Sequence, residues 1–570
     1  MIEKYMTMAD QATGQIVPLN PLTLSSGVER MFPTLTPAQI ERVAERGRRR
    51  SISSGEVLVE AGAQIVPFFV ITRGRVEVVR PSSGADVLVA LHGPGQFTGE
   101  VNMLSGRPAL LRSRVVEAGE AIELTREQLL ALVQTDSEAS ELIMRAFILR
   151  RVELIARGLG DVVLLGSSFC SETLRVKEFL TRNGHPYSYI DLDRDSAVQE
   201  FLDRFHVMPG DVPVVICRGE LVLRNPDNRK IAECLGFNTV LDGSQTRDVV
   251  IVGAGPAGLA AAVYAASEGL DTLVLETNSP GGQAGSSSKI ENYLGFPTGI
   301  SGQALAGRAY TQARKFGAQM IVAGSAQRLV CDNKPYAIEM DDGTRVLARA
   351  IIIATGAEYR VPKIERLAEF KGVGVYYGAT FMEAQLCRDE EVVVVGGGNS
   401  AGQAAVFLAQ TAKRVHMLVR GKLADSMSRY LIRRIEQNSA ISLRTNTEIV
   451  GCEGDNHLER LRWRDDNTGQ IESRDIRHVF VMTGAVPTTQ WLQNCLALDD
   501  KRFIKTGPDL SQEDLTLARW RLARHPHLLE TSLAGVFAVG DVRSGNVKRV
   551  ASAVGEGSIA ISFVHKVLTE

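Results

Sequence analysis

Three glycines near the middle of the chain have a spacing that can hold a dinucleotide pyrophosphate. They lie in the run DVVIVGAGPAGLAAAVYAASEGLDTLVLE, where Gly253-x-Gly255-x-x-Gly258 is followed by Glu276. Glycines permit a tight turn and a close approach of the backbone to the phosphates, while free N–H groups at the start of the next helix attract the anion. An acid after the second strand accepts the ribose hydroxyls. We therefore expect cofactor contacts from Gly253, Gly255, Pro256, Ala257, Gly258 and Glu276.

A second turn of this kind follows about 140 residues later, in the run EVVVVGGGNSAGQAA. Where the first unit ends in an acid, this one has Val419 followed by Arg420 and Lys422. A carboxylate would repel a 2′-phosphate, whereas arginine can pair with it, so the sequence favours NADPH over NADH. The alternative is that Arg420 only covers the surface. The residues expected at this site are Gly396, Gly398, Asn399, Ser400, Ala401, Arg420 and Lys422.

Each turn needs a strand before it and a helix after it. The apolar run that starts at 248 and the run at 391–395 predict two buried strands, and the alanine-rich segments after the turns predict helices. The order strand, turn, helix and strand is typical of the doubly wound α/β fold. The sequence therefore predicts two Rossmann-type domains.

With these residues the segment 247–570 resembles the low-molecular-weight thioredoxin reductases. The resemblance extends to five further motifs, which are Gly281-Gly282-Gln283, Glu291-Asn292-Tyr293, Ala354-Thr355-Gly356, Gly484-x-x-Pro487 and Val539-Gly540-Asp541. It implies that an NADPH-binding domain at 363–484 is inserted into an FAD-binding domain made of 247–362 and 485–570. It also implies hydride transfer from the nicotinamide to the flavin. We further expect the protein to form a homodimer. The further FAD contacts that it implies are Gly282, Gln283, Asn292, Thr355, Gly356, Gly540 and Asp541.

One family motif is missing from this chain. The family carries a redox-active C-x-x-C just before the NADPH-binding strand, and here both cysteine positions are replaced, by Gly378 and Phe381. Thiol–disulfide exchange passes through a covalent mixed disulfide, so neither replacement can take part in it. Cys387 lies six residues after Phe381 and is either a substitute thiol or a packed small apolar side chain. We expect reduced flavin to pass its electrons to a group outside this segment.

The middle segment, 160–238, is predicted to follow the order of elements of the thioredoxin fold. The predicted strands are 162–165, 187–192, 214–217 and 221–223, and the predicted helices are 173–182, 196–205 and 228–235. The stretch FCSETLRVKEFL at 169–180 resembles glutaredoxin around its active site. The resemblance puts Cys170 at the nucleophilic position, with Thr173 in place of the resolving cysteine and Pro213 in the cis-proline loop.

Two interpretations of Cys170 stay open. A cysteine before a helix has its thiolate stabilised by the helix dipole and by free N–H groups, which makes Cys170 a candidate relay thiol. Alternatively, the domain serves only for docking and Cys170 is incidental. Cys217, in a predicted core strand, and Cys234, in the last predicted helix, are interpreted as structural.

The N-terminal segment, 25–158, is predicted to contain a helix at 37–45, many short strands and a long closing helix at 138–157. It resembles the cyclic-nucleotide-binding β-roll, in which a glutamate at the position of Glu100 holds the ribose and an arginine pairs with the phosphate. Ala109 and Leu110 occupy the positions of that arginine, and Arg112 falls two or more positions away along an extended chain. A nucleotide is a candidate ligand, but these substitutions predict weak or absent binding of cyclic AMP and cyclic GMP.

Composition excludes several other classes of protein. With 44% hydrophobic residues, 23% charged residues and a net charge of −2, the chain reads as a multidomain soluble protein with no nucleic-acid partner. Its apolar runs are far shorter than the roughly 20 residues of a membrane span, and no secretion signal is visible, so we expect a cytoplasmic protein without a membrane partner. The seven cysteines lack C-x-x-C pairs, which argues against a disulfide framework or a metal site.

Three functions compete on this basis. The first is an NADPH-dependent FAD enzyme that reduces disulfides through the attached glutaredoxin-like domain or through an external thiol protein. The second is a reductase of a non-thiol acceptor such as ferredoxin or a quinone, because dithiol-free relatives of thioredoxin reductase include ferredoxin:NADP reductases. The third is a redox or nucleotide sensor whose turnover is incidental.

Overall fold

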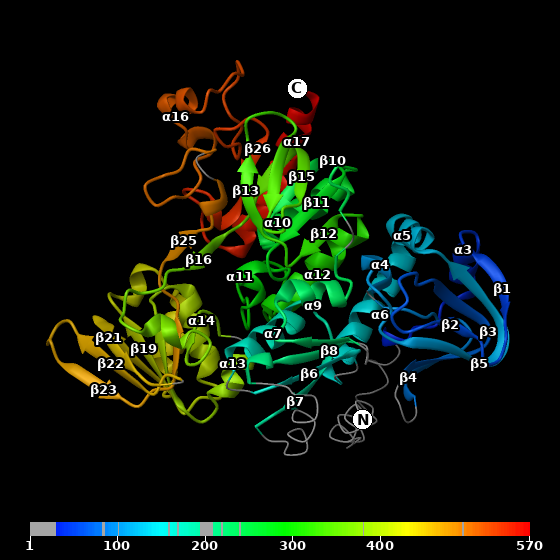
Figure 1. Ribbon diagram of the computed structural model, residues 1–570, viewed down its shortest axis with the longest axis horizontal. Helices are drawn as coiled ribbons and strands as arrows, with labels where there is room; N and C mark the ends of the chain where they lie inside the picture. Colours follow the sequence, from blue (N-terminus) through cyan, green and yellow to red (C-terminus); the bar gives the residue numbers. More distant parts are fainter. Residues whose placement is uncertain are drawn as a thin grey trace. The chain divides into compact units, whose positions relative to one another are not determined.

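The computed structural model describes residues 30–81, 86–100, 102–157, 160–167, 170–193, 209–217, 221–238, 241–379, 381–455, 457–492 and 495–570 (Figure 1). The chain divides into two compact units. One contains Met1–Ser168, Arg175–Leu241 and Thr311–Ala323, and the other contains Phe169–Leu174, Asp242–Tyr310 and Gly324–Glu570. This division differs from the four segments expected from the sequence, whose boundaries stay a prediction.

The N-terminal part of the first unit is an antiparallel β-roll closed by helices. Its sheet has the order β1-β5-β3-β4, with β2 paired to β5. The buried rings of Phe68, Phe97 and Phe147 pack against one another in the core. The elements are α3 (Pro37–Ala44), β1 (Arg48–Ile52), β2 (Val57–Val59), β3 (Phe68–Arg80), β4 (Val87–His92), α4 (Asn102–Ser105), β5 (Arg112–Leu124), α5 (Arg126–Thr135) and α6 (Ser137–Ala156). The predicted first and closing helices are confirmed within two residues at each end.

A four-stranded sheet follows in the chain, with the order β7-β6-β8-β9. Strands β6 and β7 are parallel, whereas β8 is antiparallel to both of its neighbours. The elements are β6 (Val162–Gly166), α7 (Ser171–Arg182), β7 (Tyr187–Asp191), η1 (Pro209–Asp211), β8 (Val214–Cys217), β9 (Leu221–Arg224) and α9 (Asn228–Cys234). The helix predicted at 196–205 lies outside the described residues. The bond between Val212 and Pro213 is cis.

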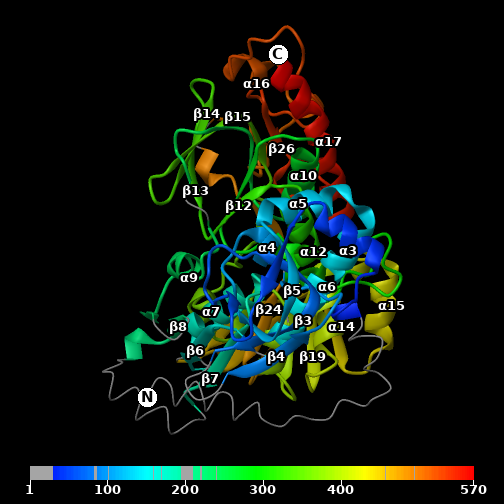
Figure 2. The ribbon, with the colours of Figure 1, turned by 90° about the vertical axis from the view of Figure 1, so that its right-hand side faces the viewer.

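The second unit contains the first glycine-rich turn. Strand β10 pairs in parallel with β11 on one side and β15 on the other, and β15 also pairs with β26. Helix α17 packs beside α10 so closely that a Cβ on Gly557 would lie 2.2 Å from the carbonyl oxygen of Ala257 (Figure 2). The elements are β10 (Thr246–Val252), α10 (Pro256–Ser267), β11 (Thr272–Glu276), α11 (Gly282–Gly285), β13 (Ala326–Val330), β14 (Tyr336–Met340), β15 (Arg345–Ile353), η4 (Gln490–Leu492), η5 (Gly507–Asp509), α16 (Gln512–Leu517), β26 (Val536–Ala538), η6 (Gly540–Val542) and α17 (Val550–Thr569). Helix α12 (Gly302–Lys315) and β12 (Gln319–Val322) complete the chain between α11 and β13.

A second parallel sheet is inserted into this part of the chain. The chain leaves through β16 and returns through β25, which pair with each other antiparallel. The inserted sheet has the order β17-β24-β18-β19-β20 and carries a three-stranded antiparallel sheet, β21-β22-β23. The elements are β16 (Ala357–Tyr359), η2 (Leu367–Phe370), β17 (Val375–Tyr376), α13 (Phe381–Leu386), β18 (Glu391–Val395), α14 (Asn399–Leu408), β19 (Arg414–Val419), η3 (Leu423–Asp425), α15 (Arg429–Gln437), β20 (Ile441–Thr445), β21 (Thr447–Glu453), β22 (Arg460–Asp465), β23 (Ile471–Arg474), β24 (His478–Val481) and β25 (Ala485–Pro487).

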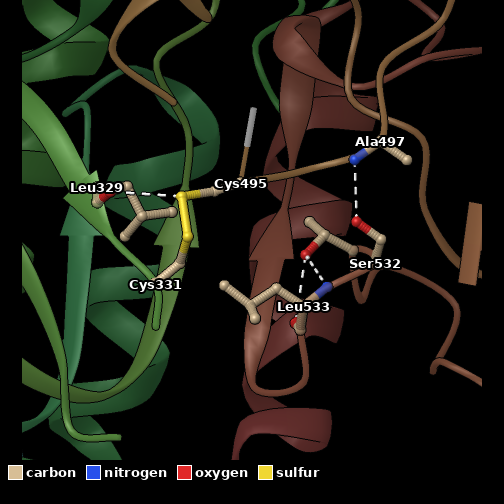
Figure 3. The surroundings of a disulfide bond; sticks show 7 residues. Leu329, Cys331, Cys495, Ala497, Ser532 and Leu533 are labelled. Atoms are coloured by element: carbon tan, nitrogen blue, oxygen red, sulfur yellow. Dashed lines mark hydrogen bonds between the residues drawn. A yellow bond between two sulfur atoms is a disulfide. The ribbon is translucent and has the colours of Figure 1, made fainter. Parts of the chain in front are cut away.

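Four of the seven cysteines form disulfides, so the expectation from cysteine spacing is wrong. Cys217 pairs with Cys234, and Cys331 pairs with Cys495 across 164 residues of sequence. Figure 3 shows the second bond, close to the place where the Ala497 N–H donates to the Ser532 hydroxyl at 2.9 Å. Pairing at such distances depends on tertiary proximity, which local spacing does not encode.

Two expected absences concern the described part of the chain only. Within it, no helix is long and apolar enough to cross a membrane. The same residues contain no cluster of three histidine, cysteine or acidic side chains that could hold a metal ion.

Candidate active site

The first glycine-rich turn has the geometry that its sequence predicts. Gly253 lies in the left-handed region, with φ of +102°, and a Cβ on Gly258 would lie 1.8 Å from the carbonyl oxygen of Gly253. Helix α10 begins with Gly255 as its N-cap and Pro256 in its first turn. Side chains at these glycines would prevent the close approach of strand and helix, so the turn leaves the helix N-terminus open to an anion.

Glu276 holds this turn together, a role that the sequence did not reveal. Its side chain is buried, and one carboxylate oxygen accepts the Ala254 N–H at 2.7 Å. The other oxygen accepts the N–H groups of Asn278 at 2.9 Å and Ser279 at 3.2 Å. The acid therefore fixes both the turn and the segment after β11.

The Gly-Gly-Gln motif lies against the first turn. A Cβ on Gly282, whose φ is +53°, would lie 3.0 Å from the Cα of Gly255. The Gln283 side chain donates to the Ala357 carbonyl at 2.5 Å, next to the residues that leave for the inserted sheet. Thr355 donates to the Thr488 carbonyl at 2.9 Å, and its neighbour Gly356 is left-handed, with φ of +66°.

Asn292 differs from the other expected FAD contacts. Asn292 is exposed. The structure brings the glycine-rich motifs together without giving Asn292 a partner among the described residues, so its contact with a cofactor stays a prediction.

The C-terminal motif is organised by Glu556, a residue of α17 that the sequence did not single out. The Glu556 carboxylate accepts the Gly540 N–H at 2.7 Å and the guanidinium N–H of Arg543 at 2.7 Å. It also accepts a side-chain N–H of Asn546 at 2.8 Å. Burial raises the pKa of the Asp541 carboxyl above its ordinary value. Asp541 is thus held in a pre-formed turn at the edge of the first dinucleotide site.

The second glycine-rich turn repeats the first. Gly396 has φ of +141°, and a Cβ there would lie 2.6 Å from the Met482 carbonyl oxygen. Gly398 is the N-cap of α14, and Ala401 is fully buried at the third position of the motif. The Asn399 side chain accepts the Ser428 N–H at 2.8 Å, so it positions the loop after β19.

Two cations lie just beyond β19, where the first unit has an acid. The Arg420 side chain is 78% exposed, and Glu448 lies 3.7 Å from its Nε atom. Lys422 is exposed. Burial raises the pKa of Tyr359 above its ordinary value, and the Ser400 hydroxyl at the start of α14 opposes this shift. Arg420 and Lys422 therefore bring two positive charges to this edge, one of them close to the Glu448 carboxylate.

Comparison with known proteins decides the family. Residues 247–557, more than half of the chain, match the family model described as pyridine nucleotide-disulphide oxidoreductase. The chain belongs to this family. Residues 49–136 match the model described as cyclic nucleotide-binding domain.

Several thioredoxin reductases are similar to this oxidoreductase. The protein of Mycolicibacterium smegmatis is 34% identical over 331 residues, which are 57% of this chain and 98% of that protein. The protein of Ureaplasma parvum is 32% identical over 323 residues, which are 56% of this chain and 97% of that protein. The crystal structure of Lactococcus lactis thioredoxin reductase in the FR conformation has a TM-score of 0.51 at 27% identity, covering 57% of this chain and 99% of that one. Thioredoxin reductases use FAD and NADPH, and the two open turns fit these two cofactors.

The oxidoreductase lacks the thiols expected at the two C-x-x-C positions. Gly378 lies near the first dinucleotide site, because a Cβ there would be 3.8 Å from the Ser286 hydroxyl. Phe381 begins α13. Cys387, the candidate substitute, is completely buried, and burial raises the pKa of its thiol to about 12. Cys387 is therefore a packed side chain that cannot supply a thiolate near neutral pH.

Cys170 lies directly before α7. Its carbonyl oxygen accepts the Leu174 N–H at 3.1 Å, so it is placed at the N-terminal end of the helix, and its side chain is partly exposed. Thr173 is buried, and its hydroxyl has no hydrogen-bond partner among the described residues. The position suits a thiolate, because the first N–H groups of a helix stabilise a negative charge.

The β-roll contains a partly open cavity of about 410 Å³. Ala109 and Leu110, at the positions of the family's phosphate-binding arginine, are part of its lining. Arg112 is not, because its guanidinium binds Glu60 at 2.7 Å and Asp86 at 3.4 Å on the outside of the roll. These two ion pairs hold Arg112 away from the place of the family's phosphate-binding arginine.

Proposed function

We propose that this oxidoreductase is an NADPH-dependent FAD enzyme that reduces a disulfide acceptor. The observation that carries the proposal is the pair of pre-formed turns, one organised by a buried acid and the other followed by two cations. FAD, when bound, supplies the group that accepts hydride from the nicotinamide and passes on its electrons.

The FAD site is assigned to the first turn, the Gly-Gly-Gln segment and the C-terminal motif. Glu276 fixes the turn and retains lone pairs for the ribose hydroxyls, while the N–H groups at the start of α10 face the pyrophosphate. Gly540 and Asp541, held by Glu556, bound the site on the other side.

The NADPH site is assigned to the second turn. Arg420 and Lys422 would pair with the 2′-phosphate, and the missing acid removes the repulsion that would exclude it. The first three residues of α14 precede its first intrahelical bond, from the Gly402 N–H to the Gly398 carbonyl at 3.1 Å, so their N–H groups would be available to the pyrophosphate.

We predict that Arg420→Ala lowers kcat/KM for NADPH by about tenfold or more, because one hydrogen bond between charged groups contributes about 1.5–3 kcal/mol. The value of kcat/KM for NADH should stay unchanged. The matched control is Arg460→Ala. Arg460 lies on β22, its side chain is 50% exposed, and it pairs with Asp475. An unchanged NADPH/NADH ratio in Arg420→Ala would show that Arg420 only covers the surface.

For the acceptor, we propose that Cys170 is the relay thiol of a glutaredoxin-like domain. The sheet order β7-β6-β8-β9, with one parallel and two antiparallel pairs, supports this fold, and the position of Cys170 before α7 supports a reactive thiolate. Cys170 would attack one sulfur of a disulfide, form a mixed disulfide and release the other sulfur as a thiolate. This mixed disulfide, whose second sulfur comes from glutathione or a partner protein, would accept the two electrons that FAD supplies when reduced, take up two protons and open to two thiols, because Thr173 cannot close a disulfide with Cys170.

A non-thiol acceptor is the second candidate, favoured by the loss of both dithiol positions at Gly378 and Phe381. Stopped-flow reduction by NADPH followed by turnover with a disulfide, a ferredoxin and a quinone distinguishes the two candidates. Cys170→Ser should abolish disulfide reduction and leave flavin reduction unchanged, whereas Cys452→Ser, at an unbridged buried cysteine, should alter neither. Equal disulfide reduction by wild type and Cys170→Ser would remove Cys170 from the electron path.

We also propose that the enzyme is a cytoplasmic homodimer. The proposal of a dimer rests on the resemblance to thioredoxin reductases, and light scattering should give twice the mass of one chain. Cell fractionation tests the compartment, and the two disulfides make this test informative, because disulfides are rare in cytosolic proteins.

A further inference from the structure

The cavity of the β-roll is lined mostly by apolar side chains. The match to the cyclic nucleotide-binding domain does not identify its ligand. Its volume of about 410 Å³ falls within the range of about 300–1,000 Å³ that is typical of small-molecule sites. Valine, leucine, methionine, alanine and phenylalanine side chains form most of the lining, including Val78, Val89, Met103, Leu110, Leu149 and Leu154. Such walls favour a hydrocarbon body over a ribose with its hydroxyl groups.

Arg150, on α6, brings a positive charge to this apolar cavity. The residue is 7% exposed and belongs to the lining. Its Nε–H donates to the Met31 carbonyl at 3.0 Å, and its Nη1 donates to the Gly99 carbonyl at 2.7 Å. Its Nη2 is buried and has no hydrogen-bond partner among the described residues. The guanidinium therefore has donor capacity left over.

No carboxylate among the described residues pairs with Arg150. Glu100, whose charge favours the protonated form of Arg150, lies 3.4 Å from the guanidinium of Arg151. Glu153 and Arg157, also in the lining, pair with each other. Burial lowers the pKa of Arg150 to about 9, which leaves it a cation at neutral pH. The nearby charge of Glu100 compensates this buried cation only in part, because the two side chains form no hydrogen bond, so an incoming anion would gain from pairing with Arg150.

The surroundings of Arg150 fit an anion in other respects. The rings of Phe32 and Phe97 lie 5.0 Å and 4.8 Å from the guanidinium carbon, so they hold the cation in place. His92 also lines the cavity, and its Nδ1 is buried without a partner among the described residues. Burial and the charge of Arg150 lower the pKa of His92 to about 3, so His92 is neutral and adds no second charge.

We propose that the β-roll binds a carboxylate with an apolar body, such as a medium-chain fatty acid or an arylalkanoic acid. The carboxylate accepts from Nη2 of Arg150, and the hydrocarbon fills the space bordered by Leu110 and Val89. A cyclic nucleotide lacks its usual phosphate partner here, because Ala109 and Leu110 replace the arginine, and its usual ribose partner, Glu100, pairs with Arg151. This ligand would be independent of the proposed reductase activity.

The test is calorimetric titration of the full-length FAD-containing protein with octanoate, octan-1-ol and cyclic AMP. Octanoate and octan-1-ol share the same hydrocarbon chain, so the difference between them reports the charge. We expect octanoate to bind wild type at least tenfold more tightly than octan-1-ol. Arg150→Gln should remove this preference while leaving the affinity for octan-1-ol within twofold. The control Arg112→Gln, on the outside of the same roll, should bind octanoate like wild type.

Several outcomes would overturn the proposal. They are equal binding of octanoate and octan-1-ol, no octanoate binding at millimolar concentration, an unaltered octanoate affinity in Arg150→Gln, and tighter binding of cyclic AMP than of octanoate. If Arg150→Gln does not fold, Leu110→Trp provides a second variant, because it fills the cavity and leaves Arg150 intact. Leu110→Trp should lower the affinity for octanoate at least tenfold, and an unchanged affinity would show that octanoate binds elsewhere.

Discussion

Replacing Glu276 by glutamine tests whether the carboxylate holds the first glycine-rich turn in place or only binds the ribose of FAD. In the structure the carboxylate accepts three backbone N–H groups, from Ala254, Asn278 and Ser279, at 2.7–3.2 Å. Glutamine has the same shape but only one acceptor atom. Whichever way its amide is turned, the NH2 group must face at least one of these N–H donors.

The expected loss follows from these contacts. A hydrogen bond to a charged group contributes about 1.5–3 kcal/mol, and at least one such bond is replaced by two opposed donors. We therefore expect Glu276→Gln to weaken FAD binding by about 2–3 kcal/mol, which corresponds to about 30- to 140-fold in Kd. The FAD-free protein should be destabilised as well, because buried N–H groups lose their acceptor without any ligand being involved.

The assay is titration of the FAD-free protein with FAD, followed by flavin fluorescence, together with thermal unfolding of the FAD-free form. Glu268→Gln, at a 44% exposed acid paired with His565, is the matched control. If Glu276 met only the ribose, FAD affinity would fall while the stability of the FAD-free form stayed at the wild-type value. A folded Glu276→Gln protein with both properties unchanged would refute the assigned role altogether.

Two further predictions concern stability. Cys495→Ser removes a disulfide between residues 164 positions apart and should lower the free energy of unfolding, measured by denaturant titration, by up to about 5 kcal/mol. Cys234→Ser removes a disulfide that spans only 17 positions and should lower it by about 3 kcal/mol. Equal losses would contradict the argument from loop entropy. His92 has a pKa of about 3 in the folded protein against an ordinary value of 6.5, so above pH 6.5 it is neutral in both the folded and the unfolded chain. As the pH drops from 6.5 towards 3, only the unfolded chain binds a proton at His92, and the free energy of unfolding falls by up to about 5 kcal/mol. His92→Gln should flatten this pH dependence of unfolding, and an unchanged slope would show that other groups cause it.

The sequence predicted most of the frame of the two dinucleotide sites because that frame is local. Gly253 and Gly396 need left-handed φ, and strand, turn and helix follow within a few residues of each, so spacing and residue type carry the information. The inserted arrangement followed from the family resemblance, and β16 and β25 now show where the chain leaves and returns.

What the sequence could not predict depends on contacts between distant segments. Glu556 reaches back to Gly540 from the neighbouring helix, and nothing in its own surroundings distinguishes it from a surface glutamate. Cys331 and Cys495 meet only because the sheet and the segment after η4 pack together. The spare N–H of Arg150 likewise becomes visible only when its partners and the cavity are known.

Counting electrons narrows the chemistry that remains open. NADPH gives up two electrons together as a hydride, and a C-x-x-C pair would take both of them by opening one disulfide. With Gly378 and Phe381 in those positions, and with the thiol of Cys387 buried and its pKa raised to about 12, the inserted domain has no such pair. Cys170 can form one bond to sulfur but cannot close a disulfide with Thr173. Disulfide reduction must therefore consume one NADPH per acceptor disulfide and pass through a mixed disulfide between Cys170 and a second sulfur, whereas two molecules of a one-electron acceptor would be reduced per NADPH. The ratio of acceptor reduced to NADPH consumed thus separates disulfide reduction from the reduction of a one-electron acceptor such as ferredoxin, whereas a quinone takes two electrons and is separated from a disulfide by the Cys170→Ser variant.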